Sequence, residues 1–450
     1  MADTICAIAT ATGGGIGIIR VSGPRAEAIG RGMVASLPEG AQSHRLYHGE
    51  ARDPASGEVL DEVLACLMRA PHSYTGETVL ELHGHGGAAN LGRMLRAVVR
   101  AGARVAEPGE FTKRAFLAGR IDLARAEAVA LVIAARSERA VRQAQAQLRG
   151  ALSEQVAALR ERLVAQLAEV EARVDFPDEH LDFVPSEQIA AELLVLAEKT
   201  EALAASYGRG RLLVEGVDVV LVGRANAGKS SLLNELVGEE RALVDAAPGT
   251  TRDFVEAEVD LAGVRVVLVD TAGERGEGDA VERRGLELGR ARWKRADLVV
   301  LVVDATAGFG EVEARIVSER AGAAMLVAWN KSDLAGQVAR VSGDVPEGMQ
   351  VVVTSAVQRG GADGLRKALV GLVADVPEEG AVVTSERQRE ALAEAGAMLR
   401  SGASVLGVAG PPELAAVDLR AALVRLGWIT GESVDAEVLD RIFASFCIGK

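Results

Sequence analysis

The chain has few aromatic residues, few cysteines and no long apolar run. Aromatic side chains make up 3% of its 450 residues, so its cores have to be built mainly from Ala, Val and Leu. Its three cysteines, Cys6, Cys66 and Cys447, are far apart and show no C-x-x-C spacing, which argues against a disulfide framework or a zinc site and fits a reducing cytoplasm. Because no stretch of about 18 apolar residues and no signal peptide are found, we expect a cytoplasmic protein without a membrane-spanning helix.

The balance of charge is acidic, with a net charge of −14. Such a chain is not a general binder of polyanions, so any contact with nucleic acid needs a local basic face. Residues 93–125 hold eight Lys or Arg against three Asp or Glu, which is a local excess of positive charge. This segment is either a surface for phosphates or carboxylates, or a solvated helix face.

The composition and the spacing of apolar residues change along the chain. Residues 1–118 mix short β-like runs with glycine turns and helical pieces, which predicts a small α+β domain. Residues 119–214 and 378–450 are Ala-rich with helical spacing of apolar residues, whereas residues 215–377 alternate buried β-branched runs with helices. We therefore predict a helical bundle domain that is interrupted by an inserted α/β domain with a mostly parallel sheet, although three domains in series is the alternative.

A phosphate-binding loop opens the inserted domain. Residues 223–230 read GRANAGKS, which matches G-x-x-x-x-G-K-[ST], and they follow an apolar strand and precede a helix. The glycines let backbone N–H groups turn toward phosphate oxygens. Lys229 is predicted to reach the β and γ phosphates of a nucleotide, and Ser230 to hold Mg²⁺.

Further nucleotide motifs follow in the expected order. Asp270 begins D-T-A-G at the end of a strand, where a carboxylate can hold Mg²⁺ through water, and Thr251 of PGTTRD is the predicted switch threonine on Mg²⁺. The N-K-S-D segment 330–333 ends another strand, and its aspartate accepts hydrogen bonds from two guanine N–H groups that adenine lacks. Ser355 and Ala356 suit a backbone contact to the guanine oxygen. Together the motifs predict a P-loop GTPase.

Two positions predict how hydrolysis is tuned. Glu274 stands where Ras-like proteins carry the glutamine that orients the attacking water. Asn226 stands in the phosphate loop where Ras-like proteins carry glycine, and its carbonyl oxygen can hold a monovalent cation beside the phosphates. We therefore expect hydrolysis to be faster in K⁺ than in Na⁺.

The layout resembles one family, the tRNA modification GTPase MnmE family, also called TrmE. The resemblance is carried by GIGIIRVSG, YTGETVLELHGHGG, EPGEFTKRAFLAGRIDLARAEA, VDFPDE, GRANAGKSSLLN, PGTTRD, DTAGE, VERRGLELGRA, NKSD and RIFASFCIGK, which span nearly the whole chain. It implies an N-terminal folate-binding domain that forms a homodimer, a helical domain completed by the C-terminal tail, and an inserted G domain.

The resemblance also implies an activity and partners. With an FAD-containing MnmG-type protein, in a heterotetramer, the GTPase would add an aminomethyl or carboxymethylaminomethyl group to C5 of the wobble uridine of certain tRNAs. The carbon would come from a tetrahydrofolate derivative, in its 5-formyl or methylene form. A regulatory or ribosome-assembly GTPase without one-carbon chemistry is the alternative.

Site residues follow from the same resemblance. Folate would be contacted by Arg20, Glu77, Arg120 and Lys450, although the family commonly has Lys where this chain has Arg120. K⁺ would be held by Asn226, Thr250 and the backbone of Asp245 and Ala247. Glu282 would position the attacking water and is preferred over Glu274 for that role, so the predicted catalytic residues are Glu282, Lys229 and Thr251. The full set predicted to contact GTP is Asn226, Ala227, Gly228, Lys229, Ser230, Ser231, Asp245, Ala246, Ala247, Pro248, Gly249, Thr250, Thr251, Asp270, Thr271, Ala272, Gly273, Asn330, Lys331, Asp333, Ser355 and Ala356.

The C-terminal CIGK sequence places Cys447 fourth from the end, where some GTPases carry a lipid anchor. Gly449 and Lys450 fit a prenylation motif poorly, and the preceding residues offer no polybasic signal. The resemblance instead implies that the tail lines the folate site. Cys447 is then either a reactive thiol in the modification chemistry or a small buried side chain that helps the tail to pack.

Overall fold

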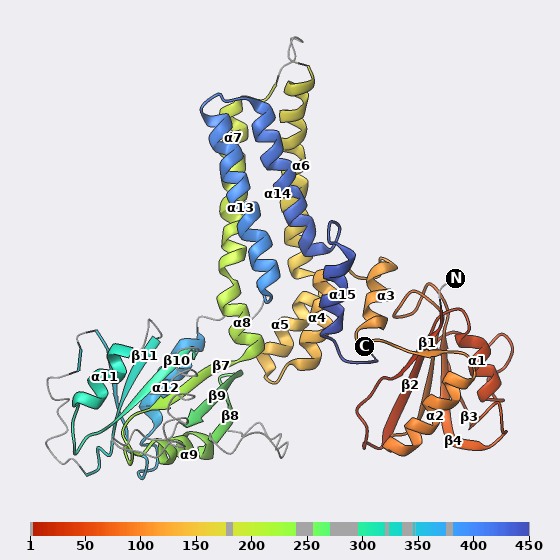
Figure 1. Cartoon of the computed structure of the whole chain (residues 1–450), viewed down its shortest axis with the longest axis horizontal. Coiled ribbons are helices and arrows are strands. Elements are labelled where there is room, and N and C mark those ends of the chain that lie inside the picture. Colours follow the sequence, from red (N-terminus) through yellow and green to blue (C-terminus); the bar gives the residue numbers. More distant parts are fainter. Residues whose placement is uncertain are drawn as a thin grey trace. The chain divides into compact units, whose positions relative to one another are not determined.

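A computed structural model describes residues 3–176, 183–239, 255–270, 296–319, 324–334, 345–346, 348–374 and 381–449 (Figure 1). The chain forms two compact units. The first comprises Met1–Ala130, Gln147–Thr200 and Ala391–Lys450, and the second comprises Leu131–Ala146 and Glu201–Glu390. The predicted combination of an α+β region, long helices and a mostly parallel sheet is confirmed, whereas the three predicted domain boundaries remain predictions.

The first unit contains a six-stranded, largely antiparallel sheet. Its strand order is β3-β4-β5-β2-β1-β6, and only the short β6 pairs in parallel, with β1. The strands are β1 (Ile5–Ile8), β2 (Ile16–Ser22), β3 (Leu46–Arg52), β4 (Val59–Met68), β5 (Val79–His85) and β6 (Arg104–Val105). Two helices, α1 (Ala26–Met33) and α2 (Ala88–Arg100), contribute to the core on one face of this sheet.

Alternation along the strands separates the two faces of this sheet. In β5, Leu80 and Leu82 are buried in the core with α1 and α2, while Glu81 and His83 point to the other face. That other face carries Ile16, Leu46 and Leu64, whose side chains are 69%, 51% and 39% exposed, respectively. The sheet therefore has one packed face and one open face with an apolar component, which here is called the open face.

Long helices form a bundle in the first unit (Figure 1). Four of them are α6 (Ala151–Asp175), α7 (Ser186–Ala205), α13 (Glu386–Gly407) and α14 (Pro412–Thr430). Leu159, Leu163 and Val170 give α6 a buried stripe at helical spacing. Ion pairs Arg162–Glu192, Arg420–Glu171 and Arg425–Glu394 join α6 to α7, α14 to α6, and α14 to α13.

The C-terminal segment packs back onto the beginning of the helical region. Helix α15 (Ala436–Ala444) contacts α3 (Glu110–Leu117). Its Phe443 is buried, with ring centroids 6.3 Å from Phe116 and 5.4 Å from Phe446. These rings share a small core with Leu123 of α4 (Leu123–Ala134). In a chain with so few aromatic residues, this cluster fixes the C-terminal tail.

The second unit is built around a six-stranded sheet of order β12-β11-β10-β7-β9-β8. All neighbouring described strands are parallel except β8, which is antiparallel to β9. The strands are β7 (Val217–Val222), β8 (Val255–Leu261), β9 (Val264–Asp270), β10 (Leu298–Asp304), β11 (Ala324–Asn330) and β12 (Gln350–Val353).

Both faces of this second sheet are covered. Val219 and Leu221 of β7 face a core shared with α9 (Lys229–Glu239) and α12 (Asp363–Ala374). Val220 and Val222 face the opposite core, which includes Ile316 of α11 (Glu311–Glu319). Continuous apolar strands are what a parallel sheet buried on both sides requires, which explains the runs of valine and leucine in the sequence.

The chain enters and leaves the second unit at neighbouring places. Helix α8 (Tyr207–Glu215) leads into β7, and its Gly210 lies so close to the returning chain that a Cβ there would be 2.0 Å from the carbonyl oxygen of Val383. The N–H of Val383 donates to Ser206 Oγ at 3.0 Å. Adjacent ends are the geometry that insertion of one domain into another requires.

A short helical segment outside the sheet is fixed to the β8–β9 hairpin within the second unit. The N–H of Arg139, in α5 (Glu138–Arg149), donates to the carbonyl of Gly263 in the hairpin turn at 3.2 Å. Arg136 pairs with Glu258 of β8 at 3.2 Å, and Glu258 also accepts from Arg265 Nε at 3.0 Å. The two arginines hold the pKa of Glu258 below its usual value, opposing burial, with the Arg265 hydrogen bond the largest influence.

None of the described helices is long and apolar enough to cross a membrane.

The aromatic cluster at the tail yields a stability prediction. Phe443→Ala removes a buried ring and is expected to lower the free energy of opening of the α3–α4 region by about 3–5 kcal/mol. Hydrogen exchange of α3 and α4 backbone amides, followed by mass spectrometry, measures this. The matched control is Leu414→Ala on α14, because Leu414 is 57% exposed. This substitution is expected to change the free energy of opening by less than about 0.5 kcal/mol. Equal protection in the two variants contradicts the prediction.

Candidate functional site

The phosphate loop lies between the end of β7 and the start of α9. Gly223 has φ 146° and sits so close to β10 that a Cβ would lie 2.3 Å from the carbonyl oxygen of Val302. The buried Lys229 folds over the loop, where its Nζ donates to the carbonyls of Gly223 at 3.1 Å and Arg224 at 2.9 Å. Asn226 adopts φ 63°, a left-handed conformation that asparagine tolerates better than most residues.

A serine hydroxyl and a strand-end carboxylate meet beside the loop. Ser230 Oγ of α9, predicted to hold Mg²⁺, donates to Oδ2 of Asp270 in β9, the carboxylate predicted to hold the ion through water. Asp270 is 9% exposed, and its other oxygen, Oδ1, is buried without a hydrogen-bond partner among the described residues. A buried carboxylate oxygen beside a serine hydroxyl is the donor set that Mg²⁺ takes in nucleotide sites, so these residues fit the ion.

The residues predicted to recognise the base lie at the carboxyl ends of β11 and β12. Asn330 is fully buried, and its Nδ2 donates to the carbonyl of Ala227 in the phosphate loop at 2.8 Å. Lys331, at φ 62°, extends its Nζ to Asp304 Oδ2 at 2.6 Å. Asp333 Oδ1 accepts from Ser355 Oγ at 2.6 Å, which orients the carboxylate predicted to bind guanine. The structure thus brings phosphate and base motifs to one edge of the sheet.

Several predicted nucleotide residues lie outside the described residues. They are Asp245, Ala246, Ala247, Pro248, Gly249, Thr250, Thr251, Thr271, Ala272, Gly273, Glu274 and Glu282. Of the predicted K⁺ ligands only Asn226 is described, and of the predicted catalytic residues only Lys229. The remaining residues predicted to contact GTP, Gly228, Ser231 and Ala356, stand in or beside the motifs described above.

The first unit contains a second polar constellation around Glu77. Glu77 Oε2 accepts from Ser22 Oγ at 2.7 Å, and Arg114 Nη1 donates to both of its carboxylate oxygens, at 3.2 and 3.1 Å. Ser22 and Thr75 are fully buried and are 2.7 Å apart, oxygen to oxygen. Glu77 is therefore held in place from β2 and α3 before any ligand arrives.

Arg20 contacts the chain's end, and Arg120 lies beside the loop that carries Glu77. Arg20 Nε donates to Glu81 at 2.8 Å, its Nη1 donates to the carbonyl of Gly449 at 3.3 Å, and its guanidinium lies 5.6 Å from the ring centre of Tyr74. A Cβ on Gly76 would be 3.5 Å from Cγ of Arg120, which places Arg120 beside the Glu77 loop. Lys450 lies outside the described residues.

The CIGK tail is fixed by its backbone. Gly449 has φ 93°, and a Cβ there would be 2.3 Å from the carbonyl oxygen of Ile8, so only glycine fits. The N–H of Gly109 donates to the carbonyl of Cys447 at 3.4 Å. The tail therefore packs against the N-terminal sheet.

The three thiols differ in exposure. Cys447 is exposed, so the alternative of a buried packing side chain is wrong: Phe446 and Gly449 take the buried positions instead. Burial raises the pKa of the Cys6 thiol to about 11, and burial also raises that of Cys66. A thiolate at neutral pH is therefore disfavoured at both of those positions.

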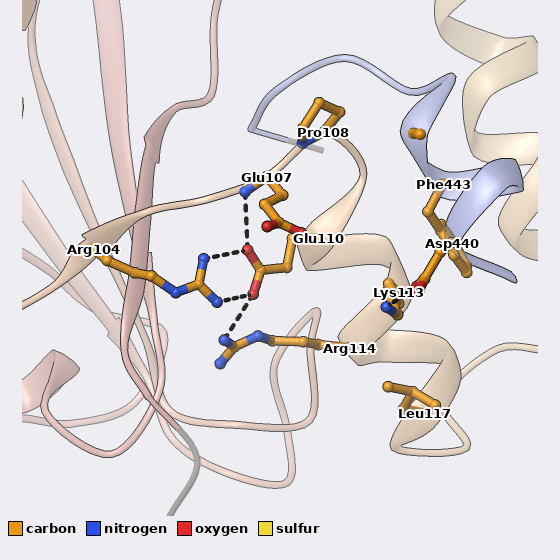
Figure 2. Close-up of a pocket in the computed structure, with 10 residues that line it drawn as sticks. Arg104, Glu107, Pro108, Glu110, Lys113, Arg114, Leu117, Asp440 and Phe443 are labelled. Atoms are coloured by element: carbon orange, nitrogen blue, oxygen red, sulfur yellow. Dashed lines mark hydrogen bonds and ion pairs between the residues drawn. The ribbon is translucent and has the colours of Figure 1, made fainter. Parts of the chain in front are cut away.

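A groove of about 690 Å³ lies between α3 and α15 (Figure 2). At its base Glu110 Oε1 accepts from Arg104 at 2.6 Å and from Arg114 at 2.9 Å, and Lys113 pairs with Asp440 across the groove. None of Arg20, Glu77 and Arg120 lines it, but Arg114 borders both this groove and the Glu77 site.

The basic segment 93–125 is largely neutralised by ion pairs. Six of its eight cations contact carboxylates, several of them distant in sequence: Arg93–Glu58, Arg100–Asp53, Arg104–Asp3, Lys113–Asp440, Arg114–Glu77 and Arg125–Asp122. These cations therefore serve mainly to hold elements of the first unit together. Sequence reasoning missed this because the partners are remote along the chain.

The fold of the second unit, its phosphate loop, its strand-end aspartate and its N-K-x-D turn define a P-loop GTPase. Two family models match the chain: "GTP-binding protein TrmE N-terminus" over residues 4–120 and "MnmE helical domain" over residues 123–447. The chain belongs to the MnmE family of tRNA modification GTPases, and it is accordingly an enzyme that acts on GTP in tRNA modification.

Full-length relatives carry the same family description. The tRNA modification GTPase MnmE of Synechococcus sp. (strain RCC307) is 44% identical over 457 residues, which cover 100% of this chain and 98% of that protein. The MnmE protein of Geobacter metallireducens is 43% identical, covering 100% and 99%. Among solved structures, the FeoB G-domain from Methanococcus jannaschii is 29% identical and covers 35% of this chain and 98% of that chain, with a TM-score of 0.27. Era from Aquifex aeolicus is 23% identical and covers 40% and 66%, with a TM-score of 0.29.

Glu110 gives a prediction with a defined pH dependence. Burial opposes its ionisation, but hydrogen bonds from Arg104, from the N–H of Glu107 and from Arg114 keep its pKa below the usual value. A lowered pKa in the folded state stabilises the fold above about pH 4.3, and this stabilisation is lost as the pH falls through the folded pKa. Glu110→Gln is therefore expected to cost about 1.5–3 kcal/mol at pH 7 and progressively less below about pH 4.

Calorimetric unfolding of the full chain between pH 3 and pH 7 measures this difference. Glu107→Gln, at an exposed neighbouring position, is the control, and the difference between its stability and that of the parent is expected not to change with pH. A Glu110→Gln cost that does not change with pH rules out the carboxylate's charge as its origin.

Proposed function

We propose that this GTPase uses Mg²⁺ and K⁺. The observation that carries the Mg²⁺ assignment is the buried, unpartnered Oδ1 of Asp270 beside Ser230. Ser230 and Thr251 would hold Mg²⁺, which neutralises charge on the phosphates, while Lys229 leaves the loop carbonyls to contact them. K⁺ would be held by Asn226, whose backbone is left-handed, together with Asp245, Ala247 and Thr250.

We assign the positioning of the attacking water to Glu282 and not to Glu274. A carboxylate directly beside the γ phosphate is repelled by its negative charge unless it turns outward, which disfavours Glu274. A glutamate acting through a second water avoids that repulsion.

The K⁺ proposal predicts a salt effect on turnover. With Mg²⁺ and GTP saturating, hydrolysis is expected to be on the order of 10-fold faster or more in KCl than in NaCl of equal concentration, because a fixed cation stabilises charge developing on the phosphates. Asn226→Gly keeps the backbone conformation but removes the carbonyl ligand, and is expected to abolish the difference. Asn234→Ala, which removes an exposed amide from α9, serves as the control. Equal rates of the parent in the two salts would falsify the proposal.

We infer that the Glu77 constellation binds a tetrahydrofolate derivative, in the 5-formyl or methylene form. A fixed carboxylate can accept two parallel N–H groups from the edge of a pterin, in the manner of a bidentate pair. Arg20, Arg120 and Lys450 supply cations for the ligand's carboxylates. The support from the structure is that Arg20 contacts Gly449, the chain's penultimate residue, and that Arg120 lies beside the loop that carries Glu77.

The one-carbon unit at this site would serve tRNA modification. We propose that the chain acts in the cytoplasm with an FAD-containing MnmG-type protein, in a heterotetramer, to place an aminomethyl or carboxymethylaminomethyl group on C5 of the wobble uridine of certain tRNAs. The exposed thiol of Cys447, two residues before Gly449, is proposed as a reactive group in this chemistry.

We propose that the N-terminal domain forms a homodimer through the open face of its sheet. Ile16, Leu46 and Leu64 expose apolar surface there, and a cross-strand row of His48, Leu64, His83 and Ile18 runs along it. Burial of such a face by its own copy removes apolar area from water in a self-complementary contact.

The folate site yields a binding prediction that separates the two candidate functions. Glu77→Gln is expected to weaken binding of 5-formyltetrahydrofolate at least about 10-fold, because one charge-assisted hydrogen bond to the pterin is lost. Isothermal titration measures the affinity, and GTP hydrolysis is expected to stay unchanged because Glu77 lies in the other compact unit. Glu58→Gln, an exposed glutamate of the same domain, is the control. A parent chain that binds no reduced folate would favour a regulatory or ribosome-assembly GTPase instead.

A further inference from the structure

Arg224, the second residue of the phosphate loop, is fixed to a helix on one face of the sheet. Its Nη2 donates to Glu313 Oε2 at 2.8 Å. The Glu313 side chain is only 2% exposed, whereas the Arg224 side chain is 36% exposed. A surface ion pair contributes little, but a buried carboxylate depends on its partner because a lone buried charge is costly.

The first turn of α11 is built around this contact. Glu313 is the third residue of the helix, and the N–H of Gly310, just before the helix, donates to the same Oε2 atom at 3.0 Å. This is the reciprocal half of a capping box. A Cβ on Gly310 would lie 2.3 Å from Arg224 Nη2, so glycine at this position leaves the space that the guanidinium occupies.

The main chain of Arg224 meets the nucleotide machinery directly. Its carbonyl accepts from Lys229 Nζ at 2.9 Å and from the N–H of Ala227 at 3.3 Å. The residue whose side chain is held by α11 therefore also shapes the loop and the resting place of the lysine. Fixing the Arg224 guanidinium restricts the Arg224 backbone, because only two backbone dihedrals and the side-chain rotamer connect the two.

We propose that Arg224, Glu313 and Gly310 form a brace that holds the phosphate loop in its nucleotide-accepting conformation. Arg224 is a positioning residue: its guanidinium points to α11, and it acts on the nucleotide through the backbone of the loop. The brace lowers the conformational cost of binding, so it should govern nucleotide affinity and release more than the chemical step. This inference concerns GTP binding alone and is independent of the folate and potassium proposals.

Three substitutions disturb the brace in different ways. Arg224→Ala removes the guanidinium, Glu313→Gln keeps the volume but removes the charge, and Gly310→Ala retains both charges while pushing the guanidinium aside. Release of a fluorescent GDP analogue, measured by stopped flow with the full chain and Mg²⁺, is expected to be on the order of 10-fold faster in each variant, the loss typical of a hydrogen bond to a charged group. KM for GTP is expected to rise while kcat at saturation stays within about twofold.

Two matched controls accompany these variants. Glu311→Gln removes an exposed carboxylate from the same first turn of α11, and Gly238→Ala adds a methyl group where nothing lies within 4 Å. Both are expected to release GDP at the parent rate.

The double variant Arg224→Ala/Glu313→Gln tests whether the residues act as one unit. Release no faster than in the single variants supports the brace, because a pair can be broken only once. Effects that multiply would overturn it, as would single variants that release GDP at the parent rate. A lowered melting temperature with unchanged release and KM would assign the pair to fold stability and also overturn the proposal. Where Arg224→Ala does not fold, Gly310→Ala gives the same decision, since only a flexible side chain has to move.

Discussion

The hydrogen bond from Asn330 Nδ2 to the carbonyl of Ala227 ties base recognition to phosphate binding. It links β11 to the loop after β7, across the end of the intervening β10. Gly228 has φ 94° and a Cβ there would lie 2.3 Å from the amide nitrogen, so the close approach needs glycine. Because Asn330 is completely buried, loss of this bond would strand a polar group in the core. The phosphate loop and the N-K-S-D turn are therefore coupled, so that movement of one would disturb the other.

In the first unit, too, the candidate site depends on contacts between segments that are distant in the sequence. Its candidate ligand carboxylate, Glu77, is positioned by a buried serine from β2 and by Arg114 from α3. Arg114 in turn shares Glu110 with Arg104, so the Glu77 carboxylate and the α3–α15 groove belong to one network of charges (Figure 2). The aromatic cluster around Phe443 then brings the last residues of the chain to the edge of the sheet. A site assembled from both ends of a 450-residue chain exists only in the folded unit.

Local patterns predicted the parts of the molecule whose function depends on local geometry. The phosphate loop and the N-K-S-D turn each follow a buried strand, and Asp270 ends one. Such motifs can be recognised from the sequence because the apolar strand beside each of them is visible there too. Long-range pairing was not predictable. The basic segment was a candidate surface on sequence grounds, but its cations pair with Glu58, Asp53 and Asp440, which are remote along the chain. Cys447 is exposed because Phe446 and Gly449 take the buried positions of the tail. The Arg224–Glu313 contact likewise joins residues 89 positions apart.

The β8–β9 hairpin has a consequence for how this chain can change in evolution. Hairpin tips usually tolerate added residues, since they face solvent. Here the two-residue tip, Ala262 and Gly263, has positive φ at both positions, and it receives the backbone N–H of Arg139. A longer tip would lose that contact and displace Glu258 from Arg136. We therefore expect related chains to keep this turn at two residues. The contact with α5 would then constrain the number of residues between PGTTRD and DTAG, although α5 contains neither motif.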